Sequence, residues 1–146
     1  MSVKYDDASW HFDGDFPEKS PIEYGGTHIA LFLKWCFIKG WAGEPYDESH
    51  EADISQVIAG TKSATDFLFE YCDGKLTDQD LNDEGNQFAA KYYGNKGRYF
   101  DDYVELFGEL MYLSAEQEHD FQKLSDLLES RFRSGNLTKK PFWKFW

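Results

Sequence analysis

The sequence contains few of the features that anchor a small protein by means other than a hydrophobic core. It has two cysteines, Cys36 and Cys72, which lie in apolar surroundings at a spacing that fits no zinc or redox motif. Its longest apolar run, residues 29–38, is interrupted by Lys34 and is shorter than the roughly 20 residues that cross a bilayer. The first residues have no apolar segment typical of a signal peptide. We therefore expect two buried thiols in a cytoplasmic protein without a membrane partner.

Strand-forming residues and catalytic motifs are also scarce. After residue 50 the only valines and isoleucines are Ile54, Val57, Ile58 and Val104, which is poor material for a sheet. The sequence has no G-x-S-x-G nucleophile elbow, no P-loop and no G-x-G-x-x-G dinucleotide motif. These absences favour a mainly α fold and indicate none of the common enzyme classes.

Positive charge is in short supply. The chain carries 27 acidic and 15 basic side chains, a formal net charge of −12, although residues 121–146 are locally basic. Most of such a surface would repel a phosphate backbone, so we predict that nucleic acid is not a partner. An acidic surface can instead steer the approach of a basic protein.

Length and aromatic content are sufficient for one well-packed domain. The chain has 146 residues, of which 18% are aromatic, so it can bury a core without metal or disulfide support. We divide this single domain into an irregular N-terminal segment, a helical body and an aromatic-basic tail, at residues 1–26, 27–135 and 136–146.

Helical periodicity is strongest at residues 27–39. Nine of the eleven residues from Ile29 to Lys39 are apolar, and Thr27 and Gly40 have the residue types that begin and end helices. A helix that is apolar on nearly all sides is buried, so this segment is predicted to be the central helix. Capping residues and apolar spacing predict about five or six helices in all, including this central helix. The other predicted helices span residues 47–59, 63–73, 77–93, 98–113 and 114–134. The predicted N-caps are Ser63 (with Asp66), Thr77, Asn82 for a split third segment, and Ser114.

The opening stretch KYDDASWHFDGDFP, residues 4–17, combines four aspartates, a histidine and four aromatic residues. One interpretation is a structural clasp. In that case Trp10, Phe12 and Phe16 pack on the central helix, and an aspartate pairs with His11 or His28 or accepts a hydrogen bond from the Trp10 indole. We favour the clasp, because a histidine in the first turn of a buried helix is usually a hydrogen-bonded core residue.

The other interpretation is an enzyme site built from Asp7, His11 and His28, with or without a metal ion. No H-x-x-x-H element supports metal binding, and the glycine between Asp13 and Asp15 does not fit the calcium-loop pattern. We therefore expect no metal and no cofactor, and no catalytic residue is assigned.

The tail, KKPFWKFW at residues 139–146, alternates aromatic and basic side chains. It either docks back onto the body or forms an exposed peptide that binds a partner, as in an adaptor domain. Docking is favoured because four exposed large aromatics promote aggregation.

Two N-terminal motifs together resemble a widespread family of small bacterial proteins. The pattern Y-D-D-A-x-W-H is followed by a T-H-I-x-x-F-x-x-W helix, and the resemblance covers about the first 45 residues. The matching positions are Tyr5, Asp6, Asp7, Ala8, Trp10, His11, Thr27, His28, Ile29, Phe32 and Trp35. Members of this family look like immunity proteins of polymorphic toxin systems.

The resemblance implies a non-enzymatic immunity protein that binds and blocks a cognate toxin, for which a basic nuclease-type domain is one candidate. Such a role fits the acidic composition, because complementary charge accelerates association. Charge density places the predicted contact on the acidic middle of the chain, at Asp73, Asp78, Asp80, Asp83, Glu84, Asp101, Asp102, Glu105 and Glu109. The residues Asp7, Trp10, His11, His28 and Trp35 are assigned to the structural motif or to the alternative enzyme site. The sequence leaves the oligomeric state open.

Overall fold

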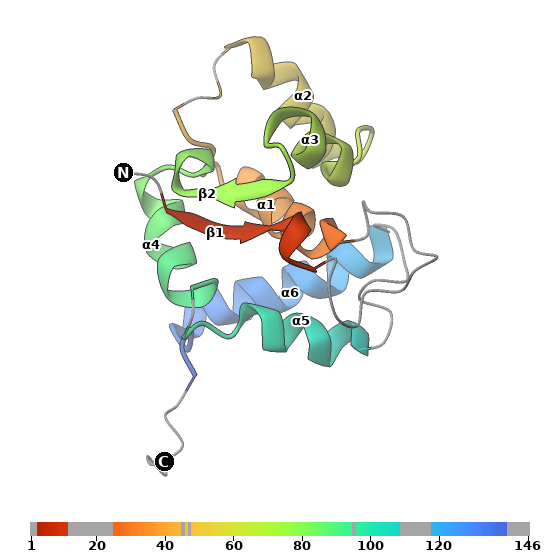
Figure 1. Cartoon of the computed structure of the whole chain (residues 1–146). Helices are drawn as coiled ribbons and strands as arrows, with labels where there is room; N and C mark the ends of the chain where they lie inside the picture. The colour runs from red at the N-terminus through yellow and green to blue at the C-terminus, as the bar shows by residue number, and fades with distance from the viewer. Residues whose placement is uncertain are drawn as a thin grey trace.

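Helices arranged around one central helix make up most of the chain (Figure 1). The computed structural model describes residues 3–11, 25–44, 46, 48–94, 96–108 and 118–139, except for the side chains of residues 11, 118 and 119. In these ranges the order is β1 (Lys4–Asp7), η1 (Ala8–His11), α1 (Thr27–Ile38), α2 (Glu48–Ala59), α3 (Ala64–Tyr71), β2 (Lys75–Thr77), η3 (Asp78–Asp80), α4 (Asp83–Tyr92), α5 (Tyr99–Phe107) and α6 (Glu118–Ser134). This arrangement confirms the prediction of a mainly α, single compact domain.

The central element is α1, as predicted. It packs against α2, α3, α6 and β2, and every residue from Thr27 to Phe37 is buried. In Figure 1 it lies behind the two strands, with α2 and α3 above it and α5 and α6 below it. The ammonium group of the buried Lys34 lies 4.3 Å from the centroid of the Phe121 ring of α6, a cation–π contact that offsets part of the cost of burying the charge.

The two ends of α1 differ in how well the sequence predicted them. The N-cap is Gly26, and Thr27 is the first helical residue rather than the cap. A Cβ atom on Gly26 would lie 2.9 Å from the Phe69 ring, which explains why a residue without a side chain is used there. At the other end Gly40 follows the C-cap with a φ of 79°, the left-handed conformation expected of a helix-ending glycine.

Side-chain caps begin the next helices largely as predicted. The Ser63 hydroxyl accepts from the Asp66 backbone N–H at the start of α3, and the Asn82 side chain accepts from Gly85 at the start of α4. The prediction that Thr77 opens a longer helix is wrong. Thr77 ends β2 and forms a capping box with Asp80 around the short η3 turn, so α4 begins only at Asp83. The predicted cap Ser114 lies outside the described residues.

The sequence did not predict the small sheet. β1 pairs with β2 in antiparallel fashion, with Lys4 opposite Thr77, Asp6 opposite Leu76 and a register irregularity between Lys4 and Asp6. Part of the segment predicted to be irregular is therefore a strand that crosses in front of α1 (Figure 1). The pairing fixes the opening motif against residues in the middle of the chain.

A single hydrophobic cluster extends from α1 to α4, α5 and α6. Its aromatic side includes Trp35, whose ring centroid lies 5.4 Å from that of Trp41 and 5.3 Å from that of Phe88. Both cysteines are free; Cys36 is buried as expected, whereas Cys72 is half-buried against the Tyr46 hydroxyl. No helix within the described ranges is long and apolar enough to cross a membrane.

Candidate functional site

The most connected polar group of the opening motif is the carboxylate of Asp6. Its Oδ2 lies 3.0 Å from Nε2 of His28 and also accepts a hydrogen bond from the Tyr93 hydroxyl, while its Oδ1 accepts from the Asp7 backbone N–H at 2.8 Å. Asp6 is 5% exposed and His28 is fully buried. An aspartate of the opening stretch therefore does pair with His28, which is one of the contacts that the clasp interpretation predicts.

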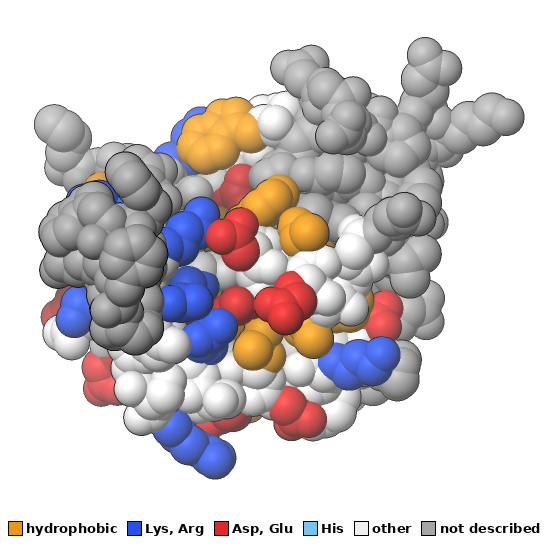
Figure 2. Space-filling view, turned by 90° about the horizontal axis from the view of Figure 1, so that it is seen from below, with side chains coloured by type: hydrophobic (Ala, Val, Ile, Leu, Met, Phe, Trp, Pro, Cys, Tyr) orange, Lys and Arg blue, Asp and Glu red, His pale blue; other side chains and the backbone are white. Residues whose placement is uncertain are grey.

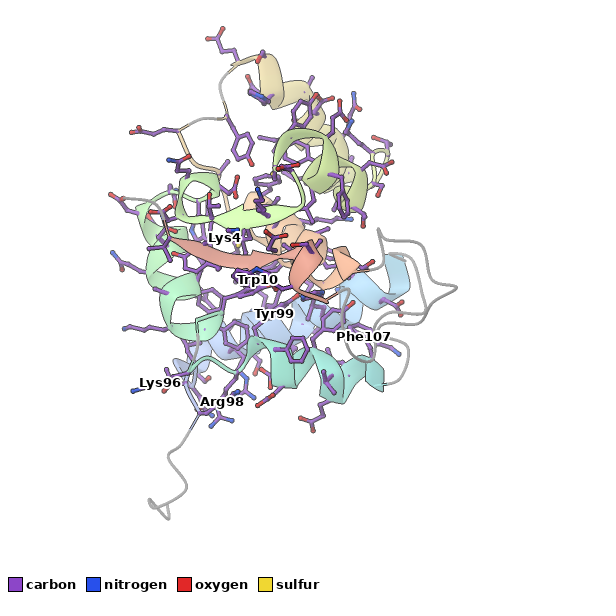
Figure 3. The ribbon with its side chains drawn as sticks, viewed as in Figure 1. Lys4, Trp10, Lys96, Arg98, Tyr99 and Phe107 are labelled. Carbon is purple, nitrogen blue, oxygen red and sulfur yellow. The ribbon has the colours of Figure 1, made fainter. Side chains whose placement is uncertain are left out.

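Two tyrosines connect this pair to α4 and α5. Tyr93 follows the last residue of α4, and Tyr99, the first residue of α5, donates its hydroxyl hydrogen to the backbone carbonyl of His28. The two tyrosine rings are stacked with centroids 4.7 Å apart. Figure 3 shows Tyr99 pointing from α5 toward the interior, below the strand that carries Lys4. The group thus joins β1, α1, α4 and α5 at one point.

Burial controls the protonation of both tyrosines. It raises the pKa of Tyr93 well above its usual value, and the nearby Asp6 carboxylate adds to the effect. Burial and the neighbouring Tyr103 likewise raise the pKa of Tyr99. Both hydroxyls therefore remain protonated donors at physiological pH. We call Asp6, His28, Tyr93 and Tyr99 the clasp cluster. Its arrangement is suited to holding elements together, because its polar groups face one another inside the protein.

Asp7 points to a different set of partners. Its carboxylate accepts from the backbone N–H and hydroxyl of Ser9 and from the Lys4 ammonium group, at 2.8 to 3.0 Å. Burial would raise the pKa of Asp7, but these hydrogen bonds outweigh it and the pKa is lowered. The structure thus pairs His28 with Asp6, and it directs Asp7, the residue named in the enzyme hypothesis, toward the turn that follows β1.

Trp10 does not act as an anchor on α1. It is 57% exposed, and its ring lies 5.4 Å from the Lys4 ammonium nitrogen, so the prediction that it packs on the central helix is wrong (Figure 3). Trp35, in contrast, is 1% exposed within α1. The side chains of His11, Phe12 and Phe16 lie outside the described part of the chain. Among the residues that are described, no group of three or more potential ligands could hold a metal ion.

The predicted acidic contact on α5 is largely neutralised. Asp102 is 6% exposed, and both of its oxygens accept from the Arg131 guanidinium at 2.9 Å, while one also accepts from Tyr92. The expectation that Asp102 contributes to a partner surface is therefore wrong, because its charge is buried and paired. Asp101 lies at the surface within 3.2 Å of Lys139. Glu105 is exposed, and Glu109 lies outside the described residues.

Figure 2 shows the face formed by this end of the molecule, on which Lys and Arg side chains gather beside Asp and Glu side chains and hydrophobic groups. Lys96 and Arg98 lie at the corner between α4 and α5, as Figure 3 shows, and the Lys96 carbonyl accepts from the Lys139 backbone N–H. The face is therefore mixed in charge, and a strongly basic partner would meet cations as well as anions there.

The acids around η3 and the start of α4 have a different environment. Glu44, Asp78 and Asp83 line an open groove of about 720 Å³ together with the amide side chains of Gln79, Asn82 and Asn86. None of the three acids forms an ion pair within the described residues. One oxygen of Asp78 accepts from the Val3 backbone N–H, but the Asp83 side chain is exposed beside the groove. We call this feature the acidic groove.

The remaining predicted contact residues border this region with separate roles. Asp80 is engaged by the Tyr46 hydroxyl at 2.6 Å and by the backbone of Thr77, so it has a structural role. Glu84 is exposed and accepts from the Trp41 indole N–H at 3.3 Å, and Asp73 is exposed beside Lys75. Glu44 was not among the predicted contact residues, because the prediction followed charge density in the middle of the chain, from Asp73 onward.

The fold and the clasp cluster together define this chain as a small, mainly α-helical domain in which Asp6 of β1 is paired with the buried His28 of α1. The chain belongs to the family described as DUF7832, a domain of unknown function, whose model matches residues 4–118. That range begins with β1 and includes every residue of the clasp cluster and of the acidic groove. Comparisons with curated proteins and with solved structures found no match.

Proposed function

We propose that this protein is an immunity protein that binds a basic toxin domain and blocks it through the acidic groove. The observation that carries the proposal is the grouping of Glu44, Asp78 and Asp83 in one groove without cationic partners among the described residues. The resemblance of the opening motifs to immunity proteins supports the same role.

Electrostatics favour the acidic groove over α5 as the contact. A carboxylate that is already paired, as Asp101 is with Lys139, contributes little field at the approach distances that determine association rates. The groove acids have no ion-pair partner within the described residues, and the amide groups between them can accept hydrogen bonds from Lys or Arg side chains. A partner with a basic catalytic surface would be attracted there and covered when bound.

The test uses the product of the neighbouring gene as the candidate toxin, together with two matched variants. Asp83→Lys reverses an exposed charge in the acidic groove, and Glu105→Lys makes the equivalent reversal on α5. Steering of this kind accounts for large changes in association rate at low salt, so Asp83→Lys should slow toxin binding by about tenfold or more. Glu105→Lys should change the association rate by less than about threefold.

The readouts are association kinetics at two salt concentrations and survival of cells that express the toxin. Equal effects of the two reversals would remove the groove from the proposal and restore α5 as a contact. If the wild-type protein neither binds the neighbouring gene product nor protects cells from it, the immunity function itself is wrong.

A further inference from the structure

The aromatic side of the core reaches the surface in a second groove, formed where α4 meets the end of α6. Trp41, Phe88, Phe132 and Leu137 provide its apolar lining, and Glu84 and Lys91 stand among its polar residues. Its volume is about 330 Å³. Phe132 is 43% exposed although its ring lies 5.3 Å from that of Trp41 and 5.8 Å from that of Phe88. We call this feature the aromatic groove.

The aromatic cluster leaves apolar ring surface exposed to solvent at the opening of the aromatic groove. Trp35 and Phe88 are almost fully buried behind the groove, while Phe132 at its opening keeps a large exposed area. Each additional aromatic side chain placed there would remove apolar surface from water and continue the edge-to-face ring contacts. The groove therefore fits an aromatic side chain better than a polar ligand.

The chain itself supplies aromatic residues close to this groove. Leu137 lines the aromatic groove, and the residues after it are fixed on the loop before α5. The Leu137 carbonyl accepts from the Arg98 backbone N–H at 3.1 Å, and the Lys139 N–H donates to the Lys96 carbonyl at 2.7 Å. The sequence then continues as KPFWKFW, residues 140–146, which lie outside the described residues.

We infer that the aromatic groove is the docking site of this chain's own residues 140–146, with Phe142 or Trp143 inserted against Phe132. The reach is sufficient, because each extended residue adds about 3.3 Å and Phe142 lies three residues beyond Lys139, the residue held at the Lys96 carbonyl. Charge is also compatible. Lys140 and Lys144 can approach Glu84, and a ring placed beside Lys91 gains a cation–π contact. This inference does not depend on the proposed immunity function.

Disulfide trapping in the full-length protein tests the inference. Gln87 is an exposed residue of the aromatic groove, and Gln122 is an exposed glutamine on the same helix as Phe132 but outside the groove. The variants Gln87→Cys/Lys144→Cys and Gln122→Cys/Lys144→Cys therefore differ only in the position of the first thiol. The native thiols interfere little, since burial raises the pKa of Cys36 well above its usual value and that of Cys72 to about 12.

If the tail docks in the aromatic groove, the Gln87→Cys pair should close within one chain at least about tenfold faster than the Gln122→Cys pair under mild oxidation. Electrophoresis without reductant separates the closed monomer from a linked dimer. Equal rates, or no closure of either pair, would overturn the inference. Linked dimers from the Gln87→Cys pair alone would also overturn it, because the groove would then hold the tail of a second copy.

A stability measurement checks the same contact without engineered thiols. Replacing the four tail aromatics by serine in the full-length chain should lower the melting temperature by about 5 °C if two rings are buried. An unchanged melting temperature would contradict docking. Neither experiment uses toxin binding, so failure of the tail inference is distinguishable from failure of the immunity proposal.

Discussion

Replacement of Asp6 by alanine is the sharpest test of the clasp cluster. The change removes the acceptor for three donors at once: His28 Nε2, the Tyr93 hydroxyl and the Asp7 backbone N–H. Of the residues that carry these donors, His28 is fully buried and Asp7 is 6% exposed, whereas Tyr93 is half-buried. Because water cannot reach them readily in the folded state, most of the lost hydrogen bonding is not replaced.

The expected cost follows from the number of donors left without an acceptor. One unsatisfied buried donor costs about 1–3 kcal/mol, and breaking a buried polar pair from one side costs about 3–5 kcal/mol. Such losses are not additive, so we expect about 3–5 kcal/mol for Asp6→Ala. The entropy of unfolding of a chain of this length is roughly 0.3 kcal/mol/K, which converts the loss to a melting temperature lower by about 10–16 °C.

Urea unfolding followed by circular dichroism measures this loss directly. Asp126→Ala is the matched control, because Asp126 is an exposed aspartate on α6 and its removal should change stability by no more than about 0.5 kcal/mol. A cost below about 1 kcal/mol for Asp6→Ala would refute the argument that β1 is pinned by this carboxylate. If Asp6→Ala does not fold, a double-mutant cycle with Asp6→Asn and Tyr93→Phe replaces it. That cycle should give a coupling energy of at least about 0.5 kcal/mol.

Three further predictions concern other parts of the fold. The pKa values of Tyr93 and Tyr99 are raised in the folded state, so the stability that these two side chains contribute is complete below pH 10. Above pH 10 the unfolded chain loses these protons first, and the free energy of unfolding should fall by about 1.4 kcal/mol per pH unit for each tyrosine. Urea unfolding at pH values between about 9 and 11 measures this fall. Arg131→Ala leaves the buried Asp102 carboxylate without its cation and should cost about 3–5 kcal/mol, whereas a loss under 1 kcal/mol would show that the pair is solvated. Gly97→Ala places a Cβ atom 1.9 Å from the last carbonyl oxygen of α4, so thermal melting should show a loss of at least about 1–3 kcal/mol; an unchanged melting temperature would contradict the close approach.

The helices were predictable where local chemistry alone determines them. The apolar composition of residues 29–39 predicted α1 and its burial, and the residue types of Ser63 and Asn82 predicted the starts of α3 and α4. These signals lie within a few residues of the structure that they determine. The predicted N-cap, Thr27, lies one position after the observed N-cap, Gly26, because the fit between Gly26 and Phe69 depends on a distant helix.

The strands were not predictable, because each is short and its partner is far away in sequence. β2 has three residues, and the polar sequence of β1 resembles a loop. The same distance in sequence explains why the sequence did not predict that Asp6, rather than Asp7, pairs with His28. Successive strand residues point to opposite faces, so the partner of His28 depends on the register of β1, which an irregularity beside Asp6 sets.

The charge predictions were limited in the same way. Asp102 stands next to Tyr103 and three residues after Tyr99, on the buried face of α5, so its helical position already indicated that it faces inward. Its cation, Arg131, comes from α6, and no pattern in the sequence connects the two. The charge total was a correct guide to an acidic molecule, but it did not indicate which carboxylates were already neutralised.

The pairing of β1 with β2 has a consequence for the order of events during synthesis. β1 leaves the ribosome before the other described elements, yet its strand partner exists only after residue 77 has been made, and the Tyr93 hydroxyl comes later still. Until β2 has been made, the sheet that aligns Asp6 with His28 cannot form, and only the chain between the two residues limits their separation. β1 is therefore fixed in place late although it is made before the elements that hold it, and a growing chain halted before β2 would expose the α1 surface that β1 and β2 later cover.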